Sequence, residues 1–202
     1  MKKLENIRLF LMDVDGVLTD GKMYYFTDSN GFDHEFKAFN SQDGIGLIVL
    51  NKFSIKTGII TGRESESVFQ RAKLLKMSFV YQGFLTKIWA LDEILRKTGF
   101  SYENVCYMGD DLPDIPVLKK VGFSVCPKNA VKEVKRVCDY ISPKKGGDGA
   151  VRDVCELILK SKKLNGLMMD GFEKGIWPKS DSLSCPENVL YSVWKKNKKE
   201  KT

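Results

Sequence analysis

Short apolar runs recur along the first 160 residues, and each run ends in a polar or glycine-containing turn. Runs of this length are typical of strands that are buried on both faces of a parallel sheet. The pattern predicts six such strands, at residues 9–12, 55–60, 79–81, 105–108, 123–126 and 140–141.

Longer amphipathic segments lie between these strands. Val68, Ala72 and Leu75, for example, recur at the spacing of one helix face. The pattern predicts helices over residues 45–52, 64–76, 87–97, 114–120 and 130–136, and a last one that ends near residue 160. Strands and helices that alternate in this order predict an α/β fold, with a parallel sheet and helices on both of its faces.

Residues 22–39 follow a different pattern, in which aromatic and polar residues alternate on either side of Asn30-Gly31. An Asn-Gly pair between two strand-like runs predicts a β-hairpin. Its aromatic residues exceed what an isolated hairpin can cover. They are Tyr24, Tyr25, Phe26, Phe32, Phe36 and Phe39. Either the chain's own core or another subunit must bury them.

From residue 165 the regular pattern is lost, and Gly, Pro and Ser are scattered among large apolar residues. A short helix over residues 187–196 is the one element that we considered there. We therefore expect one domain over residues 1–164. Residues 165–202 are expected to form an extension that is partly disordered or docked on a neighbouring subunit.

Composition narrows the class of protein. The 202 residues are 43% hydrophobic and 29% charged, which is ordinary for a globular domain. No apolar run approaches the ~20 residues that span a bilayer, and charged residues interrupt the N-terminus, so we expect a cytoplasmic protein. Much of the net charge of +7 lies in residues 195–201, which we interpret as a solvated tail, and we expect neither a nucleic-acid nor a membrane partner.

Two carboxylates follow the first predicted strand. Asp13 and Asp15 lie two residues apart, so an extended backbone turns both side chains to the same side. Ligands of open α/β sheets bind at the carboxyl ends of strands. The pair therefore indicates either a site for a cation or substrate, or a solvated acidic turn.

Three further motifs also follow predicted strands. They are Thr61-Gly62-Arg63, then Lys87 at the start of a helix, and then GDDLPD, which contains Asp110, Asp111 and Asp114. Each motif is weak alone, but four in this order form a specific pattern. The pattern resembles that of the haloacid dehalogenase-like phosphatases, which have a Rossmann-like fold.

Five segments extend the resemblance to a narrower family. DVDGVLTDG, FNSQDGIG, IITGR, GDDLPD and GGDGAVRDVCELIL resemble the 3-deoxy-D-manno-octulosonate 8-phosphate phosphatases over residues 7–160. The nonulosonate 9-phosphate phosphatases are also similar. The resemblance implies a Mg²⁺-dependent phosphatase of lipopolysaccharide biosynthesis, in which hairpins of four subunits assemble into a barrel.

Two intervals leave no room for the cap domain that many phosphatases of this superfamily carry. The first contains one hairpin and one helix, and the second is limited to residues 62–86. A capless site needs a neighbouring subunit, the hairpin or the tail to exclude water. The missing cap also argues against a phosphomutase.

The resemblance implies a role for each catalytic residue. Asp13 is the nucleophile that forms an aspartyl-phosphate, and Asp15 is the general acid and base. Thr61 and Lys87 bind the phosphoryl group and offset its charge.

The resemblance also implies a set of metal ligands. The carboxylates of Asp13 and Asp110 and the backbone carbonyl of Asp15 hold Mg²⁺. Asp111 and Asp114 either support the metal from outside its coordination sphere or orient Lys87.

For the substrate, Gly62, Arg63 and Arg71 are the candidates that follow Thr61. A guanidinium binds a carboxylate through two hydrogen bonds, as recognition of an acidic sugar requires. Arg71 alone is more often a solvated helix residue. The remaining alternative is a non-catalytic relative that binds a partner through its aromatic tail.

Overall fold

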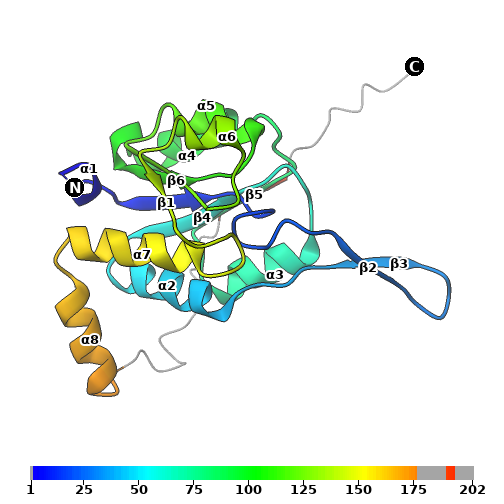
Figure 1. The fold of residues 1–202 in the computed structure, drawn as a ribbon, viewed down its shortest axis with the longest axis horizontal. Helices are drawn as coiled ribbons and strands as arrows, with labels where there is room; N and C mark the ends of the chain where they lie inside the picture. Colours follow the sequence, from blue (N-terminus) through cyan, green and yellow to red (C-terminus); the bar gives the residue numbers. More distant parts are fainter. Residues whose placement is uncertain (1, 177–189, 194–202) are drawn as a thin grey trace.

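The computed structural model describes residues 2–176 and 190–193 (Figure 1). Its centre is a seven-stranded sheet in the order β8-β7-β6-β1-β4-β5-β9, and every pair of neighbours is parallel. The strands are β1 (Leu9–Met12), β4 (Lys56–Ile60), β5 (Phe79–Gln82), β6 (Val105–Met108), β7 (Phe123–Cys126), β8 (Tyr140–Ile141) and β9 (Leu190–Val193). The predicted parallel α/β fold is confirmed, and β9 is a strand that we did not predict.

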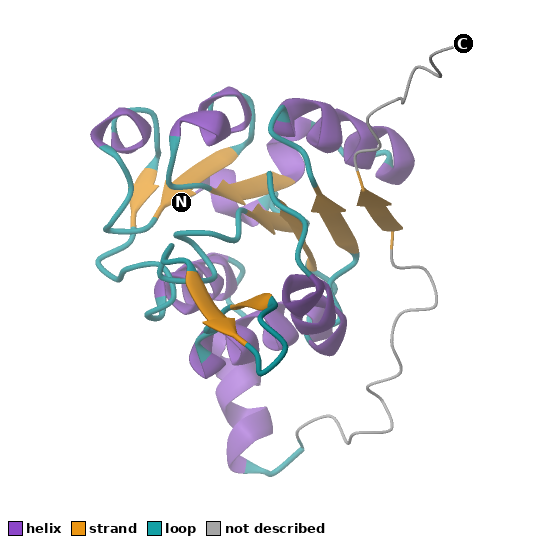
Figure 2. Cartoon of the chain, turned by 90° about the vertical axis from the view of Figure 1, so that its right-hand side faces the viewer, coloured by secondary structure: helices purple, strands orange, loops and turns teal. Residues whose placement is uncertain are grey.

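Helices cover both faces of the sheet (Figures 1 and 2). One layer contains α2 (Ser41–Lys52), α3 (Glu66–Leu74) and α7 (Ala150–Ser161), and the other contains α4 (Lys87–Thr98), α5 (Ile115–Leu118) and α6 (Lys132–Lys135). Short elements complete the fold: α1 (Lys2–Glu5), α8 (Asn165–Glu173) and the 3-10 turns η1 (Tyr102–Asn104) and η2 (Leu112–Asp114).

The apolar character of β1 follows from these two layers. Phe10 and Met12 belong to the core beneath α2 and α7, whereas Leu9 and Leu11 belong to the core beneath α4 and α5. All four side chains are fully buried. Because successive side chains point to opposite faces of a strand, a strand between two cores has no polar position until it ends.

Helix α2 begins four residues before the predicted start at residue 45. The side chain of Asn40 accepts hydrogen bonds from the backbone amides of Gln42 and Asp43 and thereby caps the helix. Asp43 in turn accepts a hydrogen bond of 2.7 Å from the amide of Arg152, in the first turn of α7. Side-chain capping, which a hydrophobic pattern does not reveal, therefore sets the boundary.

The predicted hairpin consists of β2 (Tyr24–Thr27) and β3 (Asp33–Phe36), and it extends away from the sheet (Figure 1). Four of its aromatic side chains are 47–67% exposed within this chain. They are Tyr25, Phe26, Phe32 and Phe36. Among the six aromatic residues, Phe39 is the one that packs against the main core as the structure describes it, so the described core does not bury the exposed four.

The C-terminal extension differs from our expectation where the structure describes it. The suggested helix over residues 187–196 is wrong at Leu190–Val193, because this segment is a strand that pairs with β5 at the edge of the sheet (Figure 2). β-Branched and aromatic residues fit an edge strand, and the segment LYSV contains one of each. Residues 187–189 and 194–196 lie outside the described part of the chain. Among the described residues, no helix is long and apolar enough to cross a membrane.

Candidate active site

The loop after β1 brings the first two carboxylates to the carboxyl edge of the sheet. The backbone amide of Asp13 still pairs with Met108 of β6, at 2.9 Å, so Asp13 continues the strand. Gly16 then turns the chain with a φ of +85°. A Cβ atom at Gly16 would lie 2.0 Å from Oδ2 of Asp110, so glycine is needed for the two loops to meet.

A second loop contact fixes this turn from the other side. The side chain of Asn129 donates a hydrogen bond of 3.0 Å to the carbonyl of Gly16 and accepts one of 2.7 Å from the amide of Gly146. A Cβ atom at Gly146 would lie 1.8 Å from the carbonyl oxygen of Gly16. The Gly-rich loop before α7 therefore supports the turn that carries Asp15.

Three carboxylates converge beneath this turn. Oxygen atoms of Asp13, Asp110 and Asp114 lie within 4.8 Å of one another. Burial, reinforced by the charges of Asp13 and Asp114, raises the pKa of Asp110 to about 8. The Oδ1 atom of Asp110 is buried without a hydrogen-bond partner. An orphaned carboxylate oxygen beside two other carboxylates fits a hard divalent cation such as Mg²⁺.

Asp114 has a different task from the other two carboxylates. Its Oδ1 atom accepts hydrogen bonds of 2.7 Å from both Lys87 and the hydroxyl of Tyr107. Its Oδ2 atom accepts from the backbone amides of Asp110 and Asp111, at 3.0 and 3.2 Å. Since both oxygens are used and the residue is fully buried, Asp114 orients Lys87 and the Asp-Asp loop.

Lys87 lies between two carboxylates at the start of α4. Its ammonium group is 2.7 Å from Oδ2 of Asp13 and 2.7 Å from Oδ1 of Asp114, and its side chain is 3% exposed. Burial opposes the charge of Lys87, but the two carboxylates outweigh burial, so the pKa of Lys87 is raised and the amine is protonated. Burial raises the pKa of Asp13 to about 6 against the opposing effect of Lys87. A buried cation at this place compensates the charge of Asp13 and of an incoming anion.

The remaining motif residues line the same cavity, which has a volume of about 300 Å³. Thr61 is buried at the end of β4, and its hydroxyl accepts a hydrogen bond of 3.5 Å from the amide of Arg63. The side chain of Asp111 caps η2 through the amide of Leu112. The lining residues are Asp13, Asp15, Gly21, Met23, Thr61, Gly62, Arg63, Leu85, Lys87, Asp110, Asp111 and Pro113.

Arg71 lies elsewhere. It does not line this cavity, and its guanidinium donates a hydrogen bond of 3.2 Å to the carbonyl of Asn40 and lies 5.7 Å from the ring centre of Phe39. This position links α3 to the start of α2. Arg71 as a substrate-binding residue stays a prediction, and its contacts favour a structural role.

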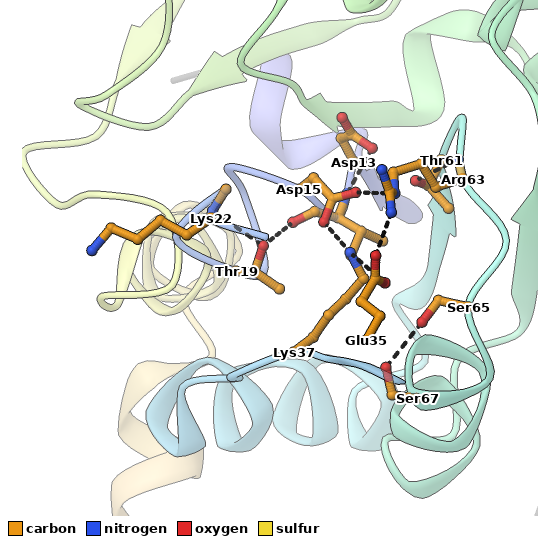
Figure 3. A network of polar contacts seen from close by, with 12 residues as sticks. Asp13, Asp15, Thr19, Lys22, Glu35, Lys37, Thr61, Arg63, Ser65 and Ser67 are labelled. Carbon is orange, nitrogen blue, oxygen red and sulfur yellow. Dashed lines mark hydrogen bonds and ion pairs between the residues drawn. The ribbon is translucent and has the colours of Figure 1, made fainter. Parts of the chain in front are cut away.

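Two residues at the end of the hairpin, which the sequence did not suggest, reach into the site (Figure 3). Lys37 forms an ion pair with Oδ1 of Asp15, and Glu35 forms one with the guanidinium of Arg63. The Nζ atom of Lys37 also lies 3.5 Å from Oε1 of Glu35. The sequence did contain one signal for these two residues. They lie two positions apart, which places both side chains on one face of the hairpin, opposite Phe36.

Comparisons with known proteins agree with this geometry. A family model described as haloacid dehalogenase-like hydrolase matches residues 73–153. A 3-deoxy-D-manno-octulosonate 8-phosphate phosphatase of Escherichia coli (strain B / BL21-DE3) is 45% identical over 159 residues, which cover 79% of this chain and 82% of that protein. The chain belongs to this phosphatase family.

Solved structures of similar proteins share the fold. The phosphatase of this family from Moraxella catarrhalis, in complex with a magnesium ion, a phosphate ion and a KDO molecule, has a TM-score of 0.78 and 42% identity over 84% of this chain and 95% of that one. A probable YrbI family phosphatase from Pseudomonas syringae has a TM-score of 0.81 and 38% identity over 85% of this chain and 96% of that one. The prediction of a phosphoric monoester hydrolase of the haloacid dehalogenase-like superfamily is confirmed.

The arrangement as a whole places the groups that phosphate-ester hydrolysis requires around one cavity. Asp13, Asp15, Thr61, Lys87 and Asp110 surround one cavity, as the order of motifs implied. A partner-binding relative would have no chemical need to bury a lysine between two carboxylates beneath an open cavity.

Proposed function

We propose that this phosphatase hydrolyses 3-deoxy-D-manno-octulosonate 8-phosphate in a Mg²⁺-dependent reaction. The observation that carries the proposal is the convergence of a nucleophile, an acid, a buried lysine and an orphaned carboxylate on one cavity. The choice of sugar is supported by the Escherichia coli relative, a 3-deoxy-D-manno-octulosonate 8-phosphate phosphatase that is 45% identical over 82% of its length.

In the first step, Asp13 attacks phosphorus and the bond to the sugar oxygen breaks. Asp15 gives its proton to the leaving oxygen, so that an alcohol departs rather than an alkoxide. Lys87 at the start of α4 and Thr61 at the end of β4 line the cavity that would hold the transferring group. The ammonium group of Lys87 offsets the charge that Asp13 and the phosphate bring together.

In the second step, Asp15 takes a proton from water, whose oxygen attacks the phosphorus of the aspartyl-phosphate. The bond between Asp13 and phosphorus breaks, and both carboxyl groups return to their initial states. One residue thus serves as acid and then as base.

The metal site in this proposal uses the carboxylates of Asp13 and Asp110 and the backbone carbonyl of Asp15. When bound, Mg²⁺ supplies positive charge that neutralises these carboxylates and the phosphate. Asp114 holds the Asp110–Asp111 loop in place through two amide hydrogen bonds. The side chain of Asp111 caps η2, so Asp111 is less suited than Asp114 to support the metal.

Selectivity for an acidic sugar is assigned to Arg63, which directly follows the Thr61–Gly62 pair. Its side chain lines the cavity and is 47% exposed, so its guanidinium is accessible to a ligand. Its partner in this structure is a carboxylate, Glu35, which has the chemistry of the acidic end of the substrate.

The proposed assembly is a homotetramer in the cytoplasm, in which hairpins of neighbouring subunits bury their aromatic residues. It is supported by the exposed aromatic side chains of β2 and β3. In the described residues, the domain has no separate cap to cover the cavity.

A phosphate-release screen tests the function. The purified enzyme is assayed on 3-deoxy-D-manno-octulosonate 8-phosphate, a nonulosonate 9-phosphate and glucose 6-phosphate, each with Mg²⁺ and with a chelator. We expect the highest kcat/KM on the eight-carbon substrate and no turnover with the chelator. A preference for the nine-carbon substrate would replace the proposed sugar, and a preference for glucose 6-phosphate would refute an acidic substrate.

A further inference from the structure

A lysine of the hairpin is buried against the general acid. The side chain of Lys37 is 2% exposed, although its neighbours Phe36 and Ala38 are exposed. Removing an ammonium group from water is strongly unfavourable unless charged partners compensate it. The two partners of Lys37 are Oδ1 of Asp15 and Oε1 of Glu35.

These contacts close a ring of four alternating charges (Figure 3). Lys37 binds Asp15 and Glu35, and Glu35 binds Arg63. The Nε atom of Arg63 lies 3.9 Å from Oδ2 of Asp15, which is beyond hydrogen-bond distance. Two members come from the hairpin, one from the loop after β1 and one from the loop after β4, so the ring joins three separate segments.

We propose that Lys37 is a positioning residue that fixes the orientation of Asp15 and thereby selects Oδ2 as the oxygen that transfers the proton. The inference rests on the proposed function, in which Asp15 is the acid and base. An ammonium group has three N–H donors and no acceptor. The oxygen that accepts from Lys37 is therefore Oδ1, and the proton of a neutral Asp15 resides on Oδ2.

This assignment holds through both steps of the reaction. The O–H bond at Oδ2 breaks as its proton moves to the leaving sugar oxygen. The hydrogen bond from Lys37 to Oδ1 remains and becomes an ion pair with the resulting carboxylate. In the second step a new O–H bond forms at Oδ2 with a proton from water. Oδ1 keeps the same partner throughout, so the carboxyl group does not rotate between its two tasks.

Glu35 extends the effect to the substrate-binding arginine. Its Oε1 atom forms an ion pair with Lys37, and its Oε2 atom accepts a hydrogen bond from the guanidinium of Arg63. The hairpin thus positions the proton donor directly and Arg63 through Glu35. A movement of β3 relative to the sheet would therefore displace the ion-pair partner of the Asp15 side chain.

The test compares substrates whose leaving groups differ in whether they need a proton. Lys37→Met is assayed on 3-deoxy-D-manno-octulosonate 8-phosphate, glucose 6-phosphate and p-nitrophenyl phosphate. The two sugar phosphates release an alcohol, which needs the acid, whereas p-nitrophenolate leaves without one. We expect kcat/KM to fall by ~10- to 100-fold on both sugar phosphates, the range for a misplaced catalytic group, and by less than ~3-fold on the aryl ester.

Two variants complete the design. Lys37→Arg keeps a cationic donor and is expected to restore part of the loss on the sugar phosphates. Lys22→Met is the matched control, because Lys22 precedes the hairpin but is 72% exposed and pairs with Asp20. We expect its kcat/KM to match the wild type on all three substrates.

The ratio of kcat/KM between two substrates does not depend on the fraction of folded enzyme, so partial unfolding of the Met variant does not obscure the result. An equal loss on all three substrates would overturn the proposal. A loss confined to the acidic sugar phosphate would also overturn it, because Lys37 would then bind the carboxylate of the substrate. If the wild type instead lacks activity on the acidic sugar phosphate, the proposed substrate fails, and the comparison of glucose 6-phosphate with p-nitrophenyl phosphate still decides the role of Lys37.

Discussion

Asp13 and Asp15 are chemically identical side chains two residues apart, and the proposed mechanism gives them different tasks. Asp13 pairs with the buried ammonium group of Lys87, on the floor of the cavity. Asp15 pairs with Lys37, which comes from the hairpin. Each carboxylate has its own lysine on a separate element, so one can act as nucleophile and the other as proton carrier.

The proposed role of Asp13 as the nucleophile is tested by Asp13→Asn. An amide cannot form the acyl phosphate, so we expect kcat to fall by more than ~100-fold, as is usual when a covalent nucleophile is lost. Lys87 keeps its ion pair with Asp114, so circular dichroism should show a folded protein. Steady-state phosphate release is the measurement, and Asp170→Asn, which changes an exposed carboxylate on α8, is the control. Activity above about a hundredth of the wild type would remove Asp13 from this role.

Selectivity is tested by Arg63→Ala. If Arg63 binds the carboxylate of the substrate, kcat/KM for the acidic sugar phosphate should fall by ~10- to 100-fold, which corresponds to a charged hydrogen bond of ~1.5–3 kcal/mol. Glucose 6-phosphate and p-nitrophenyl phosphate lack this group, and their kcat/KM should change by less than ~3-fold. Lysine at position 63 should restore activity only in part, since it cannot form the two-pronged contact.

This pattern differs from the one expected for Lys37. Loss of Arg63 should lower kcat/KM only for the sugar phosphate that carries a carboxylate. Loss of Lys37 should lower kcat/KM for every substrate whose leaving group needs a proton. Equal losses on all substrates for Arg63→Ala would place Arg63 on the phosphate or in the scaffold.

At the scale of elements, the hairpin has two faces with separate tasks. One face places Glu35 and Lys37 against the loops after β1 and β4. Other side chains, including Phe26, Phe32 and Phe36, remain exposed. Assembly at the aromatic surface would hold β3, and with it Lys37, in one position.

The hairpin also shows what the sequence reveals and what it does not. Alternation and the Asn30-Gly31 turn predicted β2 and β3, because hairpins depend on local turn chemistry. The ion pair of Lys37 with Asp15 joins residues 22 positions apart, and no local pattern encodes it. The strand β9 was missed for the same reason, since an edge strand of four residues depends on its pairing with β5.

The hairpin surface is tested by Phe26→Ser combined with Phe32→Ser. If these rings are buried between subunits, light scattering at micromolar concentration should show a tetramer for the wild type and a smaller species for the double variant. Leu74→Ser is the control, because Leu74 is 71% exposed, more than either phenylalanine, but lies on α3. A wild-type monomer, or a variant that remains fully assembled, would contradict the hairpin as the interface.

At the scale of the whole molecule, the sheet collects acidic residues from separate loops at one edge. Asp13 follows β1, and Asp110 and Asp114 follow β6, the neighbouring strand. The order of motifs predicted this convergence, since the carboxyl ends of parallel strands share an edge. The role of Asp114 was left open by the sequence, because it depends on which groups its two oxygens contact.

The buried carboxylates make the stability of the metal-free protein depend on pH. The pKa of Asp110 is about 8 in the folded protein, against an ordinary value of 3.8. Between these values the folded state binds the proton more tightly than the unfolded state does. The free energy of unfolding of the metal-free protein should therefore fall as the pH rises from about 4 to about 8.

Magnesium should oppose this loss, because it binds the carboxylate form of Asp110. At about a hundred times its Kd, a ligand adds about 2.7 kcal/mol to the free energy of unfolding, which raises the Tm of a protein of this size by ~5–10 °C. We expect the increase in Tm on adding Mg²⁺ to be larger at about pH 8.5 than at about pH 6, where a proton competes for Asp110. Thermal unfolding followed by circular dichroism, with and without Mg²⁺, is the measurement.

Asp110→Asn separates this effect from general ionic stabilisation. The amide removes one buried charge from the cluster, so the metal-free variant should unfold at a higher Tm than the metal-free wild type at about pH 8.5, where wild-type Asp110 is ionised. It should also lose the Mg²⁺-dependent increase in Tm together with its phosphatase activity, because an amide is a weaker ligand for Mg²⁺. Asp170→Asn, an exposed carboxylate on α8, is the control and should keep the wild-type response. A Mg²⁺ response that persists in Asp110→Asn would place the cation elsewhere.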